Sequence, residues 1–183
     1  MFLFYTDGSC TKNRTSISEG GYSVVILQIN EKNNQYVLID YYNEQENNVT
    51  NNQMELKGII KAFEYSQIEP YNQDICMVYT DSKYCVNICN KWLFNWVQNG
   101  WKRYNNIPLE NLSLLQTLYK YYTIDFFNCQ VKWVKGHSNN IGNELADALA
   151  RDSLQDLLII CNKYNIKIEV AAKEKIINKY NSL

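Results

Sequence analysis

The chain has 183 residues, of which 46% are hydrophobic and 14% aromatic, enough for one domain with a substantial buried core. Its formal net charge of -1 excludes a protein that attracts nucleic acid over its whole surface, so a polyanion site requires local clustering of charge. No run approaches the roughly 18 apolar residues of a membrane span, and Asp7 interrupts the apolar opening too early for a signal peptide. We therefore expect a soluble, intracellular monomer of the cytoplasm or nucleus that does not contact a membrane.

Short strands and helices follow one another in an order typical of an α/β protein. The first three apolar segments predict an antiparallel meander: Phe2–Thr6, Gly20–Ile29 and Tyr36–Tyr42. A helix follows, in which Met54, Ile59 and Phe63 recur at helical spacing and Asn52 is the expected N-cap.

The second half of the chain adds a buried strand and several helices. The continuous apolar run Ile75–Thr80 is typical of a strand buried on both faces, and Ser82 is the expected cap of the next helix. The remaining predicted elements are helical segments at Trp92–Gln98 and Leu109–Tyr122, a strand at Gln130–Val134 and a helix within "GNELADALAR". One histidine and six cysteines without a Cys-x-x-Cys pair exclude the usual zinc sites.

The tripeptide Tyr-Thr-Asp ends two of the predicted strands, in "YTDGSC" and "VYTDSKYC". If these strands lie parallel and adjacent, Asp7 and Asp81 lie side by side, and the helix that bears Glu55 crosses one face. Asp147, on the last motif helix, can reach the same place. Four carboxylates gathered in one place repel one another unless a cation binds between them. Oxygen ligands favour Mg²⁺ or Mn²⁺.

Spacing alone leaves ordinary structural roles open for each of these carboxylates. An aspartate at a strand end commonly forms a turn or cap, and Asp81 followed by Ser82 fits that role. Glu55 fits a solvated helix position equally well. Asp147 can pair with Arg151 at a spacing of i, i+4.

Five motifs in order resolve this ambiguity, because together they resemble type 1 ribonuclease H, the family that cuts the RNA strand of an RNA/DNA hybrid. The motifs, which span Phe2 to about Arg151, are "YTDGSC", "TNNQMEL", "YTDSKY", "NGWK" and "VKGHSNNIGNELADALA". The resemblance implies a ribonuclease H-like α/β fold with a mixed five-stranded sheet, three antiparallel strands and then two parallel ones, flanked by helices. It also implies that the acidic metal-binding tetrad is Asp7, Glu55, Asp81 and Asp147.

The same resemblance implies a metal-dependent endoribonuclease that binds two Mg²⁺ ions, with Mn²⁺ able to substitute, and leaves 5′-phosphate and 3′-hydroxyl ends. Two metals about 3.5–4 Å apart can activate water and stabilise the leaving oxygen without a protein nucleophile. His137 occupies the position of the catalytic-loop histidine, where it could shuttle a proton or assist product departure. The alternative function is a non-catalytic nucleic-acid-binding or connector domain of the same fold, which the intact tetrad disfavours.

Polar residues beside the tetrad are candidates for recognising the hybrid, because short polar side chains can detect the ribose 2′-hydroxyl. They flank Asp7 and Glu55: Ser9, Cys10, Asn13, Asn51, Asn52 and Gln53. Many asparagines of this Asn-rich chain will instead form turns. By resemblance Thr50 contributes to a pocket for a DNA-strand phosphate, and Asn143 matches a motif position, although a helix cap explains Asn143 nearly as well.

A local basic segment supplies the positive charge that the whole chain lacks. Between Ser82 and Leu109 there are four basic residues and no acidic one. Trp92 and Trp96 are expected to anchor helices, whereas Trp101, Lys102 and Arg103 are candidates for contact with the nucleic acid.

The domain organisation is expected to be a catalytic domain at residues 1–152 and an extension at residues 153–183 that packs on the same domain. The extension has no family motif. It is expected to stabilise the domain; the alternative is a docking surface for a polymerase or another protein partner.

Overall fold

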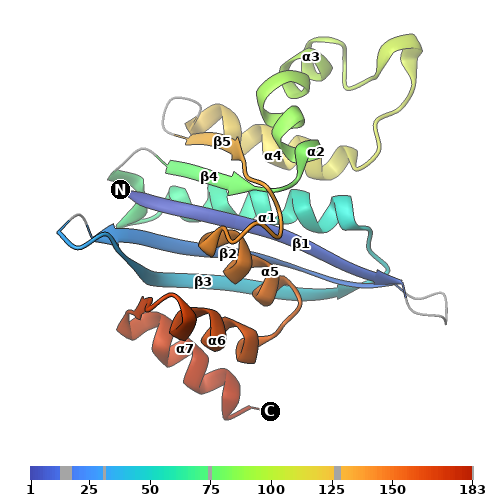
Figure 1. Cartoon of the computed structure of the whole chain (residues 1–183). Coiled ribbons are helices and arrows are strands. Elements are labelled where there is room, and N and C mark those ends of the chain that lie inside the picture. Colours follow the sequence, from blue (N-terminus) through green and yellow to red (C-terminus); the bar gives the residue numbers. More distant parts are fainter. Residues whose placement is uncertain (13–17, 31, 74–75, 126–128, 183) are drawn as a thin grey trace.

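The computed structural model describes residues 1–12, 18–30, 32–73, 76–125 and 129–182 (Figure 1). Within these residues, six strands form one mixed sheet in the order β5-β4-β1-β2-β3-β6. Their bounds are β1 Phe2–Lys12, β2 Ser18–Asn30, β3 Gln35–Asn47, β4 Cys76–Thr80, β5 Cys129–Trp133 and β6 Lys167–Ile168. The first three strands are antiparallel, and β1, β4 and β5 are parallel, as predicted.

Helices cover both faces of this sheet (Figure 1). Helices α1 and α4 pack together on one face, and α5, α6 and α7 cover the other, while α2 and α3, which follow β4, project beyond the β4–β5 side of the sheet. Their bounds are α1 Asn51–Ser66, α2 Lys83–Asn87, α3 Leu93–Gln98, α4 Leu112–Asp125, α5 Ile141–Ala150, α6 Leu154–Lys163 and α7 Val170–Tyr180. In the described part of the chain, no helix is both long and apolar enough to cross a membrane.

Alternation along the central strands builds a separate core on each face. Phe4 and Ile26 are fully buried in the cluster under α1 and α4, whereas their neighbours Tyr5 and Leu27 belong to the cluster under α5, α6 and α7. Successive side chains of a strand point to opposite faces, so a strand covered on both sides has continuous apolar sequence. This pattern makes β1 and β2 the buried centre of the sheet.

The sheet has one strand more than the predicted five. Strand β6 lies in the extension and pairs in parallel with β3 at Val37 and Leu38, and Glu169 donates its backbone N–H to the Leu38 carbonyl at 2.9 Å. A strand of two residues is too short to show periodicity, which is why the sequence did not predict it.

The extension contributes side chains to the second core. Leu157 of α6 is fully buried and Ile176 of α7 is 5% exposed, and both belong to the cluster that contains Tyr5 and Leu27. Buried apolar area of this kind stabilises folding. The extension therefore shares a core with the sheet.

The sequence predicted the N-cap of α2 correctly and the N-cap of α1 incorrectly. Ser82 caps α2 by accepting a hydrogen bond from the Cys85 N–H at 3.2 Å, as predicted. The predicted cap Asn52 of α1 is wrong: the N-cap is Thr50, which forms a reciprocal capping box with Gln53. The capping box satisfies two groups at once, which a single asparagine at position 52 would not.

Candidate active site

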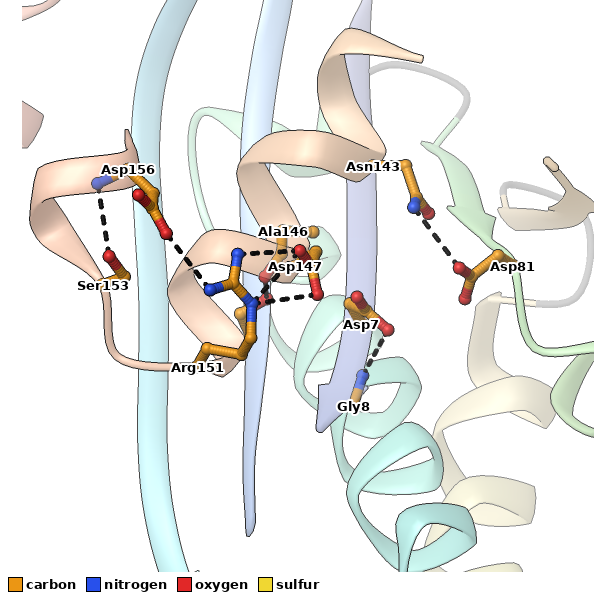
Figure 2. Close-up of polar contacts among 10 residues, drawn as sticks. Asp7, Gly8, Asp81, Asn143, Ala146, Asp147, Arg151, Ser153 and Asp156 are labelled. Carbon is orange, nitrogen blue, oxygen red and sulfur yellow. Dashed lines mark hydrogen bonds and ion pairs between the residues drawn. The ribbon is translucent and has the colours of Figure 1, made fainter. Parts of the chain in front are cut away.

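Asp7 and Asp81 lie next to each other because two parallel strands are in register. Thr6 of β1 pairs with Thr80 of β4, so the two aspartates follow at equivalent positions on neighbouring strands. The Asp7 side chain is held by the Gly8 backbone N–H, which donates to Oδ1 at 2.8 Å, and the residue is only 9% exposed (Figure 2). The strand pairing thus places one buried and one partly exposed carboxylate side by side.

Glu55 joins them because the start of α1 approaches β1 closely. A Cβ atom at position 8 would collide with the backbone of Met54 and Glu55, so this contact requires Gly8. The Glu55 carboxylate accepts hydrogen bonds from the Ser82 hydroxyl and, at 2.8 Å, from the Asn51 amide. Glu55 is therefore oriented by a residue of its own helix and by the cap of α2.

Helix α5 brings two more site residues. Asn140 is its N-cap and accepts from the Asn143 N–H at 3.1 Å, so the alternative that Asn143 is the cap is wrong. The buried Asn143 side chain instead donates to Asp81 Oδ2 at 3.3 Å (Figure 2). Asp147 lies one turn further along the helix, where both of its carboxylate oxygens accept hydrogen bonds from Arg151. Asp147 therefore both pairs with Arg151 and lines the pocket, so the two alternatives that the sequence left open for it hold together.

The loop before α5 brings the histidine to the same place. Gly136 lies so close to the Asp81 carboxylate that a Cβ atom there would collide with it. His137 follows with a positive φ of 49° and is exposed. A pocket of about 280 Å³ is lined by the four tetrad members and five further residues: Asp7, Gly8, Ser9, Cys10, Asn51, Glu55, Asp81, His137 and Asp147. The structure therefore brings together residues from five separate segments of the chain.

Burial, together with the charge of neighbouring carboxylates, raises the pKa of two members of the tetrad, Asp7 and Glu55. Burial, followed by the neighbouring Asp81 charge, raises the pKa of Asp7 to about 8, and Asp147 and Glu55 act in the same direction. Burial also raises the pKa of Glu55, against the lowering effect of its hydrogen bond from Ser82. The pocket is thus a place where negative charge is costly and a cation would be stabilised.

The carboxylate oxygens of the tetrad are suitable ligands for a hard divalent cation, although in this structure those of Glu55, Asp81 and Asp147 are hydrogen-bonded to neighbouring side chains. Among the described residues, no three His, Cys, Asp or Glu side chains are gathered closely enough to hold a metal as they stand. Asp147 faces Arg151, Glu55 faces Ser82 and Asp81 faces Asn143. The buried Asn143 Oδ1 has no hydrogen-bond partner within the described residues, which suits a neighbouring water bound to a cation. Oxygen donors of this type, with waters completing the shell, are those that Mg²⁺ prefers.

The other predicted polar residues lie in the pocket or at the start of α1, apart from one that the structure does not describe. Ser9, Cys10 and Asn51 line the pocket. Asn52 is exposed in the first turn of α1, next to the capping pair Thr50 and Gln53. Asn13 lies outside the described residues. The structure thus keeps most of the predicted polar residues near the start of α1.

The three candidates for contact with nucleic acid, Trp101, Lys102 and Arg103, lie in the loop after α3, in the projection formed by α2, α3 and this loop, and none of them lines the pocket. Trp101 is partly buried and packs edge-on against Tyr119, with ring centroids 5.8 Å apart. Lys102 and Arg103 are exposed, and Arg103 lies 3.7 Å from Glu110. Trp101 therefore anchors the projection to α4, whereas the side chains of Lys102 and Arg103 are exposed to solvent.

Trp133 is a site neighbour that the sequence interpretation missed. It ends β5, its indole N–H donates to the Asp81 carbonyl at 3.1 Å, and the Lys83 ammonium lies 5.1 Å from its ring centroid. Its position directly before the "VKGH" motif is the only sequence signal. Its bond to the Asp81 backbone fixes the turn that follows β4.

Comparisons with known proteins agree with this geometry. The family model described as RNase H matches residues 1–155. Ribonuclease H of Rickettsia bellii is 36% identical over 158 residues, covering 86% of this chain and 92% of that protein. The solution structure of the PFV RNase H domain superposes with a TM-score of 0.71 at 25% identity, over 86% of this chain and 94% of that one. The crystal structure of LC9-RNase H1 gives a TM-score of 0.65 at 28% identity, over 84% and 72%.

Proposed function

This chain belongs to the ribonuclease H family, and from that premise we propose that Asp7, Glu55, Asp81 and Asp147 hold two Mg²⁺ ions, or Mn²⁺ in their place. The enzyme is an endoribonuclease that hydrolyses the RNA strand of RNA/DNA hybrids. The proposal concerns three points: the residues that hold the metal ions, the identity of the metal, and the chemical groups at the ends of the cleaved RNA.

The observation that supports the proposal is the convergence on one pocket of four carboxylates, from β1, α1, the turn after β4, and α5. Burial and mutual repulsion raise the pKa of Asp7 to about 8, so the metal-free arrangement is electrostatically unfavourable. Divalent cations would relieve this repulsion, and they supply an activated water and stabilisation of the leaving oxygen at a phosphodiester. The expected products are a 5′-phosphate and a 3′-hydroxyl.

The protein side chains around the carboxylates position them. Ser82 and Asn51 restrain Glu55, and Asn143 restrains Asp81. To His137, which is exposed and lines the pocket, we assign proton exchange with the reacting phosphate or assistance to product departure.

Recognition of the hybrid is assigned to two surfaces. Ser9, Cys10 and Asn51 line the pocket beside the carboxylates, where short polar groups can contact a ribose 2′-hydroxyl. Asn52, Gln53 and Thr50 continue this surface at the start of α1, and Thr50 is the proposed contact to a DNA-strand phosphate. Lys102 and Arg103 of the projection attract backbone phosphates further along the duplex.

The test uses end-labelled substrates of one sequence that differ only in their sugars: RNA/DNA hybrid, double-stranded RNA, double-stranded DNA and single-stranded RNA. With Mg²⁺ or Mn²⁺, we expect cleavage within the RNA strand of the hybrid alone, and a chelator should abolish it. The product ends are checked with an exonuclease that requires a 5′-phosphate and a polymerase that requires a 3′-hydroxyl. Equal cleavage in chelator, or cyclic phosphate ends, would contradict the metal assignment.

A non-catalytic binding or connector domain is the competing function. It would bind the hybrid without cleaving it under every metal condition. The same assay, read by gel shift as well as by cleavage, separates the two.

A further inference from the structure

Arg151 connects the carboxylate pocket to the C-terminal extension. It is the C-cap of α5, and its guanidinium donates to Asp147 from Nη2 at 2.9 Å and from Nε at 3.2 and 3.3 Å. The remaining nitrogen, Nη1, donates to Asp156 Oδ2 at 3.1 Å (Figure 2). One side chain therefore contacts a proposed metal ligand and the first turn of α6 together.

Asp156 is itself held in place by the fold. Its backbone N–H donates at 3.2 Å to Ser153, the N-cap of α6, and the start of a helix favours a carboxylate. Leu154 and Leu157 bury the same turn in the second core. Asp156 is thus a fixed acceptor for the guanidinium.

The two contacts of Arg151 have opposite consequences for Asp147. The forked guanidinium occupies both oxygens of Asp147 and offsets its charge, so a cation must share or displace this contact. Asp156 competes for the same guanidinium and adds a negative charge nearby. Only 26% of the Asp147 side chain is exposed, so water replaces these contacts incompletely.

We propose that Arg151 is a positioning residue that restrains Asp147 in the metal-free protein, and that Asp156 weakens this restraint by sharing the guanidinium. The extension thereby adjusts how readily the pocket binds a divalent cation. This inference rests on the proposed role of Asp147 as a metal ligand.

The test measures Mn²⁺ binding by titration calorimetry on the full chain without nucleic acid. Arg151→Gln should bind Mn²⁺ more tightly by about three- to tenfold, because one positive charge beside the ligand is removed. Asp156→Asn should bind more weakly by about two- to threefold, because Arg151 then pairs with Asp147 alone. In the double variant the effect of Asp156→Asn should be clearly smaller, since the part that acts through Arg151 is then absent and only the loss of the nearby negative charge remains.

Three further variants make the result decisive. Lys167→Gln removes an equal charge from the extension, where Lys167 pairs with Glu169 at 2.7 Å, and should leave Mn²⁺ affinity unchanged. Arg151→Lys, which keeps the charge but not the fork, should give an intermediate affinity and covers the case in which Arg151→Gln fails to fold. Asp147→Asn should weaken Mn²⁺ binding.

Weaker or unchanged binding by a folded Arg151→Gln protein would overturn the inference. So would an Asp156→Asn effect of the same size in both backgrounds. Equal binding by wild type and Asp147→Asn would instead contradict the proposed metal site.

Discussion

The carboxylate pocket and the basic projection present opposite ways of placing charge. Asp7 is 9% exposed and lies where glycine lets a helix start touch a strand, whereas Tyr104 beside Lys102 and Arg103 is 89% exposed. The Arg103 contact to Glu110 is long, at 3.7 Å, and such exposed pairs contribute little to stability. The pocket therefore depends on exact placement and the projection mainly on the sign of its charge, so substitutions in the two regions should have effects of different size and kind.

The largest effect is expected from Asp81→Asn, which keeps the shape of the side chain and removes its charge. Loss of a metal ligand should lower kcat by about 10³-fold or more, because metal stabilisation of the transition state amounts to several kcal/mol. Single-turnover cleavage of the hybrid measures this, and circular dichroism checks that the fold is retained. If the variant cleaves the hybrid at a rate within tenfold of wild type, Asp81 is not an essential metal ligand.

The next largest effect is expected from His137→Ala. A positioned acid or base contributes about 10²- to 10⁴-fold, and the exposed position of this residue at the rim favours the lower end, about 10²-fold in kcat. Hybrid binding, measured with Ca²⁺ in place of Mg²⁺, should be unchanged. Abolished binding with normal kcat at saturation would move His137 from the chemistry to substrate contact.

A smaller effect, in KM alone, is expected from replacing Lys102 and Arg103 together by Ala. KM should rise by about tenfold at moderate salt, and the dependence of log affinity on log salt should become shallower by about 0.7–0.9 for each phosphate that the variant no longer neutralises. The matched control is Lys163→Ala with Lys167→Ala in the extension, which removes equal charge. A reduced kcat at saturation would show that the projection also positions the scissile bond.

The last prediction concerns stability: the difference in melting temperature between wild type and Asp7→Asn should depend on pH. Because the folded pKa of Asp7 is raised from 3.8 to about 8, the folded protein binds this proton more tightly than the unfolded chain does. The stabilising contribution is complete below about pH 4 and is lost as pH rises through 8. Metal-free Asp7→Asn protein should therefore differ least from wild type near pH 4 and melt higher at pH 8.5, by about 3–8 °C for roughly 1–3 kcal/mol.

Calorimetry in chelator measures this difference, with Glu174→Gln as the exposed control. Saturating Mg²⁺ should reverse the order at pH 8.5, since only wild type retains the ligand. If the melting temperatures of wild type and Asp7→Asn differ by the same amount at every pH, the pKa of Asp7 is not raised in the folded protein.

Local sequence signals predicted most of the fold. The apolar runs that end at Thr6 and Thr80 indicated two buried strands, and their parallel pairing followed from the order of elements. Strand β6 and the Thr50 cap were missed. The first is too short for a periodic signal, and the second depends on which of several polar residues completes a reciprocal bond.

The site was predictable in its members and less so in its contacts. The motifs named the four carboxylates and His137, which line one pocket. The contact of Asn143 with Asp81 joins segments 62 positions apart in the chain, and the sharing of Arg151 between Asp147 and Asp156 depends on how α6 turns back after α5. Contacts of this kind arise from tertiary packing, which no local pattern encodes.

The pairing of β6 with β3 also affects how one molecule meets another. An uncovered strand edge offers a row of free backbone donors and acceptors to any neighbouring chain and so invites aggregation. At Val37 and Leu38 this row is filled by the chain's own β6, and the Lys175 ammonium lies beside Asp40 further along the same strand. A segment outside the family motifs thus protects this part of the outer edge of β3 against strand addition by other molecules at high concentration.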